Sequence, residues 1–167
     1  MFWYVLHVKL NRASQLVRFF NKQEAIDAFI PKEERWFNRK GVKDYVVKDV
    51  YPDYVFVKSE LNRAEFDHKF KDFFASVAGF VDVLEKEDVY PLSNQEQFLL
   101  EKLFGNGEVI KHSVGDSIHG KFVAKSGPLV GLEDWIVKVD RHKRLATLQC
   151  DGFMERFKVA AEVVEKR

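Results

Sequence analysis

The segment Arg141-His142-Lys143-Arg144 places four cationic or hydrogen-bonding side chains side by side between two apolar stretches. Such side chains are rarely buried without partners, so we expect them at the surface. There they can bind phosphates, and arginine can also stack on exposed bases. The alternative is a solvated hairpin tip, which is the usual position of a run of charges.

A second basic segment, Lys111-His112, precedes the same region of the chain. Because successive strands of a small β domain alternate in direction, this segment is expected at the same end as the cationic turn. The turn at Lys125-Ser126 is expected at the other end. The residues that we predict to contact nucleic acid are therefore Lys111, His112, Arg141, His142, Lys143 and Arg144.

Aromatic residues surround the strongest strand signal in the chain, Tyr54-Val55-Phe56-Val57. Tyr54 and Phe56 share one face of such a strand. Tyr51 precedes them, and His7 on the first predicted strand borders the same patch. Exposed aromatic rings suit the desolvated centre of a protein interface; the alternative is that they fill the core. The face that Tyr54 occupies decides between the two.

No combination of residues predicts catalysis or metal binding. The five histidines show no HxxxH or HExxH spacing, and glycine-rich phosphate loops and GxSxG are absent from the sequence. Acidic pairs such as Glu33-Glu34 lack an accompanying nucleophile and oxyanion donor. Cys150 alternates with Ala146 and Leu148, which predicts a core position. We therefore predict a protein that is not an enzyme, with no catalytic residue, no metal and no cofactor.

The first half of the chain has the element order of a ferredoxin-like domain, β-α-β-β-α-β. The second predicted helix has a capping pair, Asn62 with Glu65. Gly41 marks the tip of a polar hairpin. The predicted elements are a strand at 2–9, a helix at 13–23, strands at 28–30 and 54–57, a helix from Asn62 to Gly79, and a strand at 80–84.

A connector with a short helix follows, introduced by Ser93 and Glu96 and ended by Gly105-Asn106-Gly107. Beyond it, short strands alternate with turns, which predicts a small five-stranded barrel. The predicted strands include 117–124, 135–139, 145–150 and 153–159, with a hairpin at Asp151-Gly152. We place domains at 1–88 and 111–167, with the connector at 89–110.

Composition limits the class of protein. Hydrophobic residues make up 46% of the 167 residues, and charged residues make up 32%, as in ordinary globular domains. Residues 111–167 carry 11 Lys+Arg against 8 Asp+Glu, which makes this part slightly basic. One cysteine allows no internal disulfide. The absence of a leader-like or membrane-spanning run predicts a cytoplasmic protein without membrane contact, which we expect to be monomeric.

Two groups of motifs resemble the NusG family of transcription elongation factors. The first comprises Trp3-Tyr4, Phe29-Ile30-Pro31, Arg39-Lys40-Gly41 and the block from Tyr51 to Val57, with Tyr for Phe and Asp for Gly in that block. The second comprises Gly115-Asp116 and the segment from Lys125 to Gly131, which resembles the KOW motif of the family's SH3-like barrel. The glycine that usually ends that motif is replaced around Asp134-Trp135. Together the motifs cover almost the whole chain.

This resemblance implies that the first domain binds the clamp helices of the largest subunit of bacterial RNA polymerase through Tyr51, Tyr54, Phe56 and His7. The segments Pro91-Leu92-Ser93 and 139–144 look most like the LoaP branch, whose members are specialised antiterminators that recognise leader RNA. The expected partners are therefore polymerase and a nascent leader RNA, with a hairpin as the expected RNA shape. Alternatives are a general NusG-type factor whose barrel binds proteins, and an enzyme with an RNA-binding tail.

Overall fold

The computed structural model describes residues 1–8, 12–76, 89–151 and 156–167. The chain contacts divide it into two units that are interleaved in sequence. The first unit comprises residues 1–31 and 51–93, and the second comprises residues 32–50 and 94–167. The second unit thus combines an internal hairpin of the N-terminal half with the whole C-terminal part.

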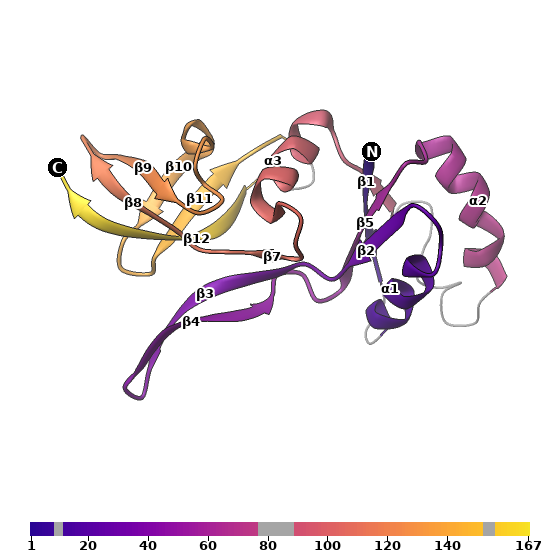
Figure 1. Ribbon diagram of the computed structural model, residues 1–167, viewed down its shortest axis with the longest axis horizontal. Coiled ribbons are helices and arrows are strands. Elements are labelled where there is room, and N and C mark those ends of the chain that lie inside the picture. Colours follow the sequence, from indigo (N-terminus) through magenta and orange to yellow (C-terminus); the bar gives the residue numbers. More distant parts are fainter. Residues whose placement is uncertain (9–11, 77–88, 152–155) are drawn as a thin grey trace. The chain divides into compact units, whose positions relative to one another are not determined.

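The first unit contains a four-stranded sheet and two helices (Figure 1). The strand order is β2-β5-β1-β6, with β5 antiparallel to both β1 and β2, and β6 antiparallel to β1. The elements are β1 Phe2–His7, α1 Ala13–Asn21, β2 Ile26–Phe29, β5 Tyr54–Ser59, α2 Arg63–Ser76 and β6 Val89–Pro91. No helix connects β2 to β5; an inserted hairpin lies between them in the sequence.

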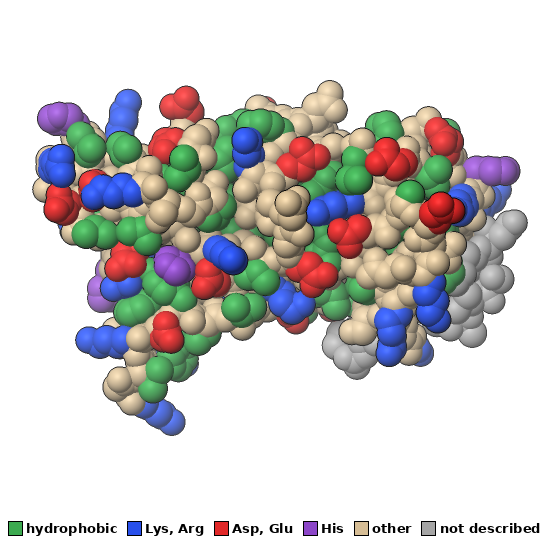
Figure 2. Space-filling view, viewed as in Figure 1, with side chains coloured by type: hydrophobic (Ala, Val, Ile, Leu, Met, Phe, Trp, Pro, Cys, Tyr) green, Lys and Arg blue, Asp and Glu red, His purple; other side chains and the backbone are tan. Residues whose placement is uncertain are grey.

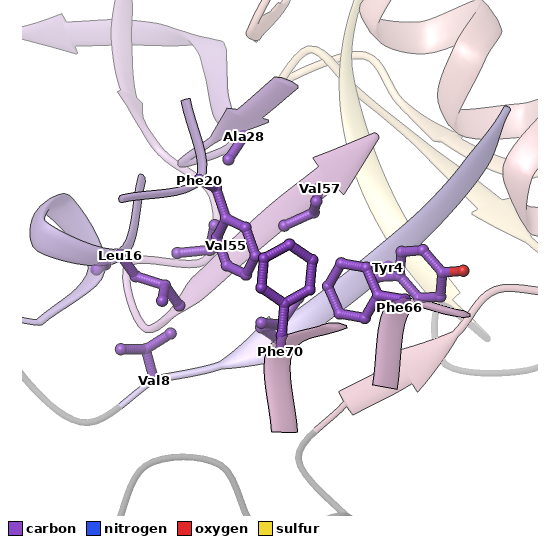
Figure 3. Packing of buried hydrophobic residues seen from close by; sticks show 11 residues of the cluster. Tyr4, Val8, Leu16, Phe20, Ala28, Val55, Val57, Phe66 and Phe70 are labelled. Atoms are coloured by element: carbon purple, nitrogen blue, oxygen red, sulfur yellow. The ribbon is translucent and has the colours of Figure 1, made fainter. Parts of the chain in front are cut away.

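Both helices cover the same face of this sheet. Leu16 and Phe20 of α1 and Phe66 and Phe70 of α2 belong to one buried cluster with inward residues of β1, β2 and β5. The Phe20 and Phe70 rings lie 5.1 Å apart between the sheet and the helices (Figure 3). Apolar residues recur at helical spacing in both helices and at every second strand position, which directs them into this cluster. The central strands β1 and β5 are also buried on their other side, at Trp3, Val5 and Phe56.

Local capping fixes the helix ends. The Asn62 side chain accepts a hydrogen bond from the Glu65 backbone N–H at 3.0 Å, as the capping pair predicts. At the end of α1, the Asn21 amide exchanges two hydrogen bonds with the backbone of Ala28, at 2.7 and 2.9 Å. The amide of Asn21 therefore ties α1 to β2.

The inserted hairpin belongs to the second unit. It consists of β3 Lys32–Arg39 and β4 Val42–Asp49. The two turn residues, Lys40 and Gly41, both have positive φ (52° and 77°), which is the backbone of a tight two-residue hairpin turn. This turn pairs Trp36 with Tyr45 across the hairpin. The hairpin continues as a three-stranded sheet through β7 Val109–Ile110, which is parallel to β3.

The helix α3, Asn94–Phe104, precedes β7 in the second unit. Leu99, Leu100, Leu103 and Phe104 are buried, which agrees with their predicted apolar side. Gly105 ends the helix with a positive φ of 59°, and its N–H donates to the Glu101 carbonyl.

Five strands form the C-terminal sheet, in the order β10-β11-β12-β8-β9. They are β8 Ser113–Ile118, β9 Lys121–Ser126, β10 Ile136–Asp140, β11 Leu145–Gln149 and β12 Arg156–Lys166, with a 3-10 turn, η2, at Glu133–Trp135. Inward positions such as Ala146, Leu148 and Val159 are fully buried. The alternation of buried and exposed residues along β11 is the pattern of a sheet with one covered face.

The KOW-like residues hold this sheet together. A Cβ on Gly115 would lie 2.2 Å from the Val123 carbonyl oxygen, so only glycine allows β8 and β9 to approach. Asp116 is buried and pairs with Lys125 at 2.9 Å. The hydrogen bond from Lys125 lowers the pKa of the Asp116 carboxyl below its ordinary value. Gly115 and Asp116 therefore serve the packing of β8 against β9.

The predicted mixed α+β composition is confirmed, and five strands are present in the C-terminal sheet, although the pairings leave β9 and β10 as its edges. The single strand predicted at 117–124 is wrong. His119 and Gly120, both at positive φ, turn the chain there between β8 and β9. The predicted strand 80–84, and most of the Asp151-Gly152 hairpin, lie outside the described residues. The predicted domain bounds stay a prediction.

Among the described residues, no helix is long and apolar enough to cross a membrane.

Candidate functional site

The aromatic face of the first unit is the side of its sheet away from the two helices. Tyr4, Val55 and Val57 belong to the helix-side cluster. Because side chains alternate along a strand, His7 of β1 and Tyr54 of β5 lie on the opposite side. The predicted test, which face Tyr54 occupies, therefore favours a surface role for Tyr54.

Three partly exposed rings lie together on this face. His7 and Tyr54 are direct partners in the β1–β5 register, and their rings are 4.9 Å apart. Tyr51 contacts Tyr54 edge to face at 5.8 Å. A turn holds Tyr51 there, because the Tyr54 N–H donates to the Tyr51 carbonyl at 3.1 Å. The backbone at Asp53 keeps a negative φ, so this turn does not need the glycine of the family pattern.

Phe56 has a different environment from its neighbours. It is fully buried, and its ring lies edge-on to Phe29 at 5.7 Å and to Trp3 at 6.4 Å. The Lys58 ammonium lies over the Trp3 ring at 4.7 Å. Of the four residues predicted to contact polymerase, His7, Tyr51 and Tyr54 are thus partly exposed, and Phe56 packs beneath the surface.

The cationic turn is built by Asp140. The Asp140 carboxylate accepts a hydrogen bond from the Lys143 backbone N–H at 2.9 Å, and this bond lowers the pKa of Asp140 below its ordinary value. Arg141, His142 and Lys143 are exposed. Arg144 has a positive φ of 53°, and its carbonyl accepts a hydrogen bond from Ala161 of β12. The turn therefore exposes three of its four predicted side chains.

Arg144 is directed to the β3–β4 hairpin instead. The centre of its guanidinium lies 3.6 Å from the centre of the Trp36 ring, and one guanidinium nitrogen lies 3.0 Å from a carboxylate oxygen of Glu162. The same nitrogen donates to the Tyr45 hydroxyl at 3.3 Å. Burial raises the pKa of Tyr45 above its ordinary value, and the hydrogen bond from Arg144 opposes this rise. A stacked and paired arginine of this kind contributes to packing.

His112 contacts the same hairpin. Its ring stacks on Tyr45 with centroids 3.8 Å apart and planes 4° apart. Its backbone N–H donates to the Glu34 carboxylate at 3.0 Å, and its Nδ1 lies 3.3 Å from the same oxygen. His112 and Arg144 are thus brought together, as predicted, but with Tyr45 between them.

Lys111 is exposed next to His112. The arrangement divides the six predicted nucleic-acid contacts into two sets. The exposed set is Lys111, Arg141, His142 and Lys143, and the set engaged with the hairpin is His112 and Arg144.

Sequence reasoning missed the partners of Arg144 and His112, which are Trp36, Tyr45 and Glu34 of the hairpin and Glu162 of β12. The Trp36–Tyr45 pair follows from a two-residue turn at Lys40-Gly41, so that pair could have been found. Its contact with Arg144 has no signal in the sequence, because about a hundred residues separate the partners.

Two further features bear on what the surface can do. No group of three or more His, Cys, Asp or Glu residues suited to a metal occurs in the described part of the chain. Figure 2 shows Lys and Arg side chains interspersed with acidic ones and a basic end on the β3–β4 hairpin. That end carries the exposed residues Arg39, Lys40 and Lys43.

Comparison with protein families matches residues 1–101 to the family model described as transcription termination factor nusG. A search of curated proteins finds no significant match.

Proposed function

The chain belongs to the NusG family, and we propose that it binds bacterial RNA polymerase during elongation and changes its pausing or termination. The proposal concerns binding alone and needs no chemical step by this chain. Differential affinity for the closed, processive state of polymerase is sufficient to shift the enzyme toward that state.

The observation that supports the polymerase contact is the position of Tyr54. It lies on the face opposite the two helices, beside His7 and Tyr51. Tyrosines of this kind are typical anchors of protein interfaces. We propose that these three residues contact the clamp helices of the largest polymerase subunit. Phe56, which is buried beneath them, supports this face by packing.

We further propose the specialised branch of the family, a LoaP-like antiterminator that is recruited by a leader RNA. Support comes from the exposed cationic turn Arg141 to Lys143 and from Lys111. Because polymerase binding holds the RNA-binding part near the transcript, a modest RNA affinity is raised by effective concentration. Two modest contacts then select particular operons.

Polymerase binding is tested with the full chain and a Tyr54→Ala variant. Loss of an interface anchor costs at least about 2 kcal/mol, or roughly 30-fold in affinity. The matched control is Phe2→Ala, since Phe2 is 45% exposed on β1 and alternates onto the other side from His7. Equal affinities of the two variants for polymerase would reject the proposal that the aromatic face binds polymerase.

Antitermination is tested by transcription through a terminator on templates with and without a structured leader. Read-through that requires both the protein and the leader supports the specialised function. Polymerase binding without leader-dependent read-through reduces the proposal to a general elongation factor.

The general factor remains the second candidate because the C-terminal sheet also carries exposed apolar side chains. Val123 and Val137 are 41% and 48% exposed and line one open groove with Phe122. Exposed apolar side chains of this kind suit a protein partner. The Val123→Ser variant would bind such a partner more weakly and would keep its affinity for RNA.

A further inference from the structure

A basic groove lies on β10, β11 and β12. At its β12 side, Arg35 of the β3–β4 hairpin donates a hydrogen bond to the Lys158 carbonyl at 3.1 Å. The lining of the groove comprises Lys138, Asp140, Lys143, Leu145, Thr147, Arg156, Phe157 and Lys158. Of these, only Lys143 was predicted from the sequence to contact nucleic acid. The groove therefore extends from the cationic turn across three strands.

The strand register places the cations in order. Lys138 pairs with Thr147, and Thr147 pairs with Lys158, so one row crosses all three strands. Arg156 follows on the same side of β12, about 7 Å from Lys158, because residues two apart share a face. Directly paired residues, and residues two apart on one strand, point to the same side of a sheet. The side chains of Lys138, Arg156 and Lys158 therefore lie on one side of this sheet.

The groove carries four cations against one carboxylate, Asp140. That carboxylate already accepts the backbone N–H of Lys143. Within the described ranges, none of the four cationic side chains forms an ion pair with a carboxylate. Arg144, by contrast, is paired with Glu162. An excess of uncompensated positive charge in one concave region attracts polyanions.

The shape and lining of the groove favour a backbone over a small molecule. Its volume is about 240 Å³, which is below the roughly 300–1,000 Å³ of small-molecule pockets. Only Leu145 and Phe157 are apolar in the lining, and Phe157 is 7% exposed. Lysine binds phosphate as a point charge, so several separated cations suit a chain of phosphates better than one small anion.

We propose that this groove binds the phosphodiester backbone of the transcript beside the RNA segment that the cationic turn contacts. The inference rests on the proposed leader-RNA recognition and names the surface and the chemical group involved. Phosphate contacts position a nucleic acid without reading its sequence, so the groove supplies affinity and the turn retains the contacts that reach bases.

The test is binding of a leader RNA to the full chain across a salt series. The variant replaces the groove cations Lys138, Arg156 and Lys158 by Gln. The matched control removes the same charge from three exposed lysines elsewhere in the second unit, Lys102, Lys121 and Lys166. Circular dichroism of both variants checks that they are folded, as expected for exposed positions.

The groove variant is expected to bind RNA roughly 10- to 100-fold more weakly, with the slope of log K against log salt reduced by about 2. The loss is expected to be equal for the leader and for a scrambled RNA of the same length. The control variant is expected to change much less. A single-stranded DNA of the same sequence shows whether the 2′-hydroxyl adds to the backbone contact.

Different failures are distinguishable. If the wild-type chain shows no salt-dependent RNA binding, leader recognition fails and the groove fails with it. If the wild-type chain binds and the groove and control variants bind equally, the groove alone is rejected. Loss of affinity for DNA or for an acidic peptide, with RNA affinity unchanged, also overturns the proposal.

Discussion

The aromatic face and the cationic turn are assembled by different kinds of contact. His7, Tyr51 and Tyr54 meet through strand pairing and a four-residue turn in one sheet. Arg144 and His112 meet through Tyr45, which the β3–β4 hairpin supplies from far along the chain. Both surfaces join residues that are distant in sequence. The aromatic face forms within the register of one sheet, whereas the contacts of Arg144 and His112 form by packing against a separate hairpin.

This difference separates binding residues from packing residues. On the aromatic face, alternation places partly exposed Tyr54 on the side of β5 opposite buried Val55. In the cationic turn, adjacent polar residues have different environments: Arg144 is stacked on Trp36, and Arg141 is exposed. A run of like residues at a turn is therefore not one site until its tertiary neighbours are known.

The largest expected effect comes from the buried member of the aromatic face. Phe56→Ala is expected to lower the free energy of unfolding by about 3–5 kcal/mol, because a fully buried phenylalanine leaves a cavity. Tyr54→Ala is expected to lower it much less while weakening polymerase binding. Urea denaturation of both variants measures the difference. Equal losses would mean that Tyr54 is a core residue.

The helix side of the same sheet has an alkaline signature. Burial raises the pKa of Tyr4 to about 12, and its hydroxyl donates to the Leu61 carbonyl at 2.6 Å. The folded chain therefore keeps a proton that the unfolded chain loses above pH 10. The contribution of Tyr4 to the free energy of unfolding is fully present below pH 10, and about 2–3 kcal/mol is lost between pH 10 and 12.

Chemical denaturation at pH 9 to 12 checks this loss. Tyr4→Phe is the control, since it cannot ionise. It is expected to be less stable at neutral pH by about 1 kcal/mol for the lost hydrogen bond, with a shallower decline in alkali. An unchanged decline would assign the alkaline effect to other groups.

Removal of the engaged arginine sharpens the comparison further. Arg144→Ala is expected to destabilise the second unit by about 1–2 kcal/mol, through loss of the stacking on Trp36 and of the Glu162 ion pair. A double-mutant cycle with Trp36→Ala should give a coupling energy of about 0.5–2 kcal/mol. Strict additivity of the two variants would contradict the contact.

The smallest expected effect on stability belongs to the exposed arginine of the same turn. Arg141→Ala should change the free energy of unfolding by no more than about 0.5 kcal/mol, because its side chain is exposed. Its RNA affinity, measured on the full chain, should fall and become less salt-dependent. A large loss of stability with unchanged RNA affinity would reverse the roles of Arg141 and Arg144.

The sequence by itself determined the secondary structure of most of the described chain, and it left open which side of the sheet Tyr54 occupies. Helical spacing and a capping pair specify α2 from Arg63, and strand alternation puts Tyr54 and Val55 on opposite faces. These signals are local because backbone geometry repeats every 2 or 3.6 residues. Where two positive-φ residues form a tight turn without a recognised signal, as at His119-Gly120, a hairpin was mistaken for one strand.

Only the tertiary structure decided which cations are free. The register of β10, β11 and β12 brings Lys138 and Lys158 into one row, and the β3–β4 hairpin engages Arg144 and His112 in stacking. Stacking and ion pairing form between residues that are distant in sequence, and such partners leave no periodic pattern along the chain. The charge of a residue therefore follows from its amino-acid type, whereas its availability for binding depends on the residues that pack against it.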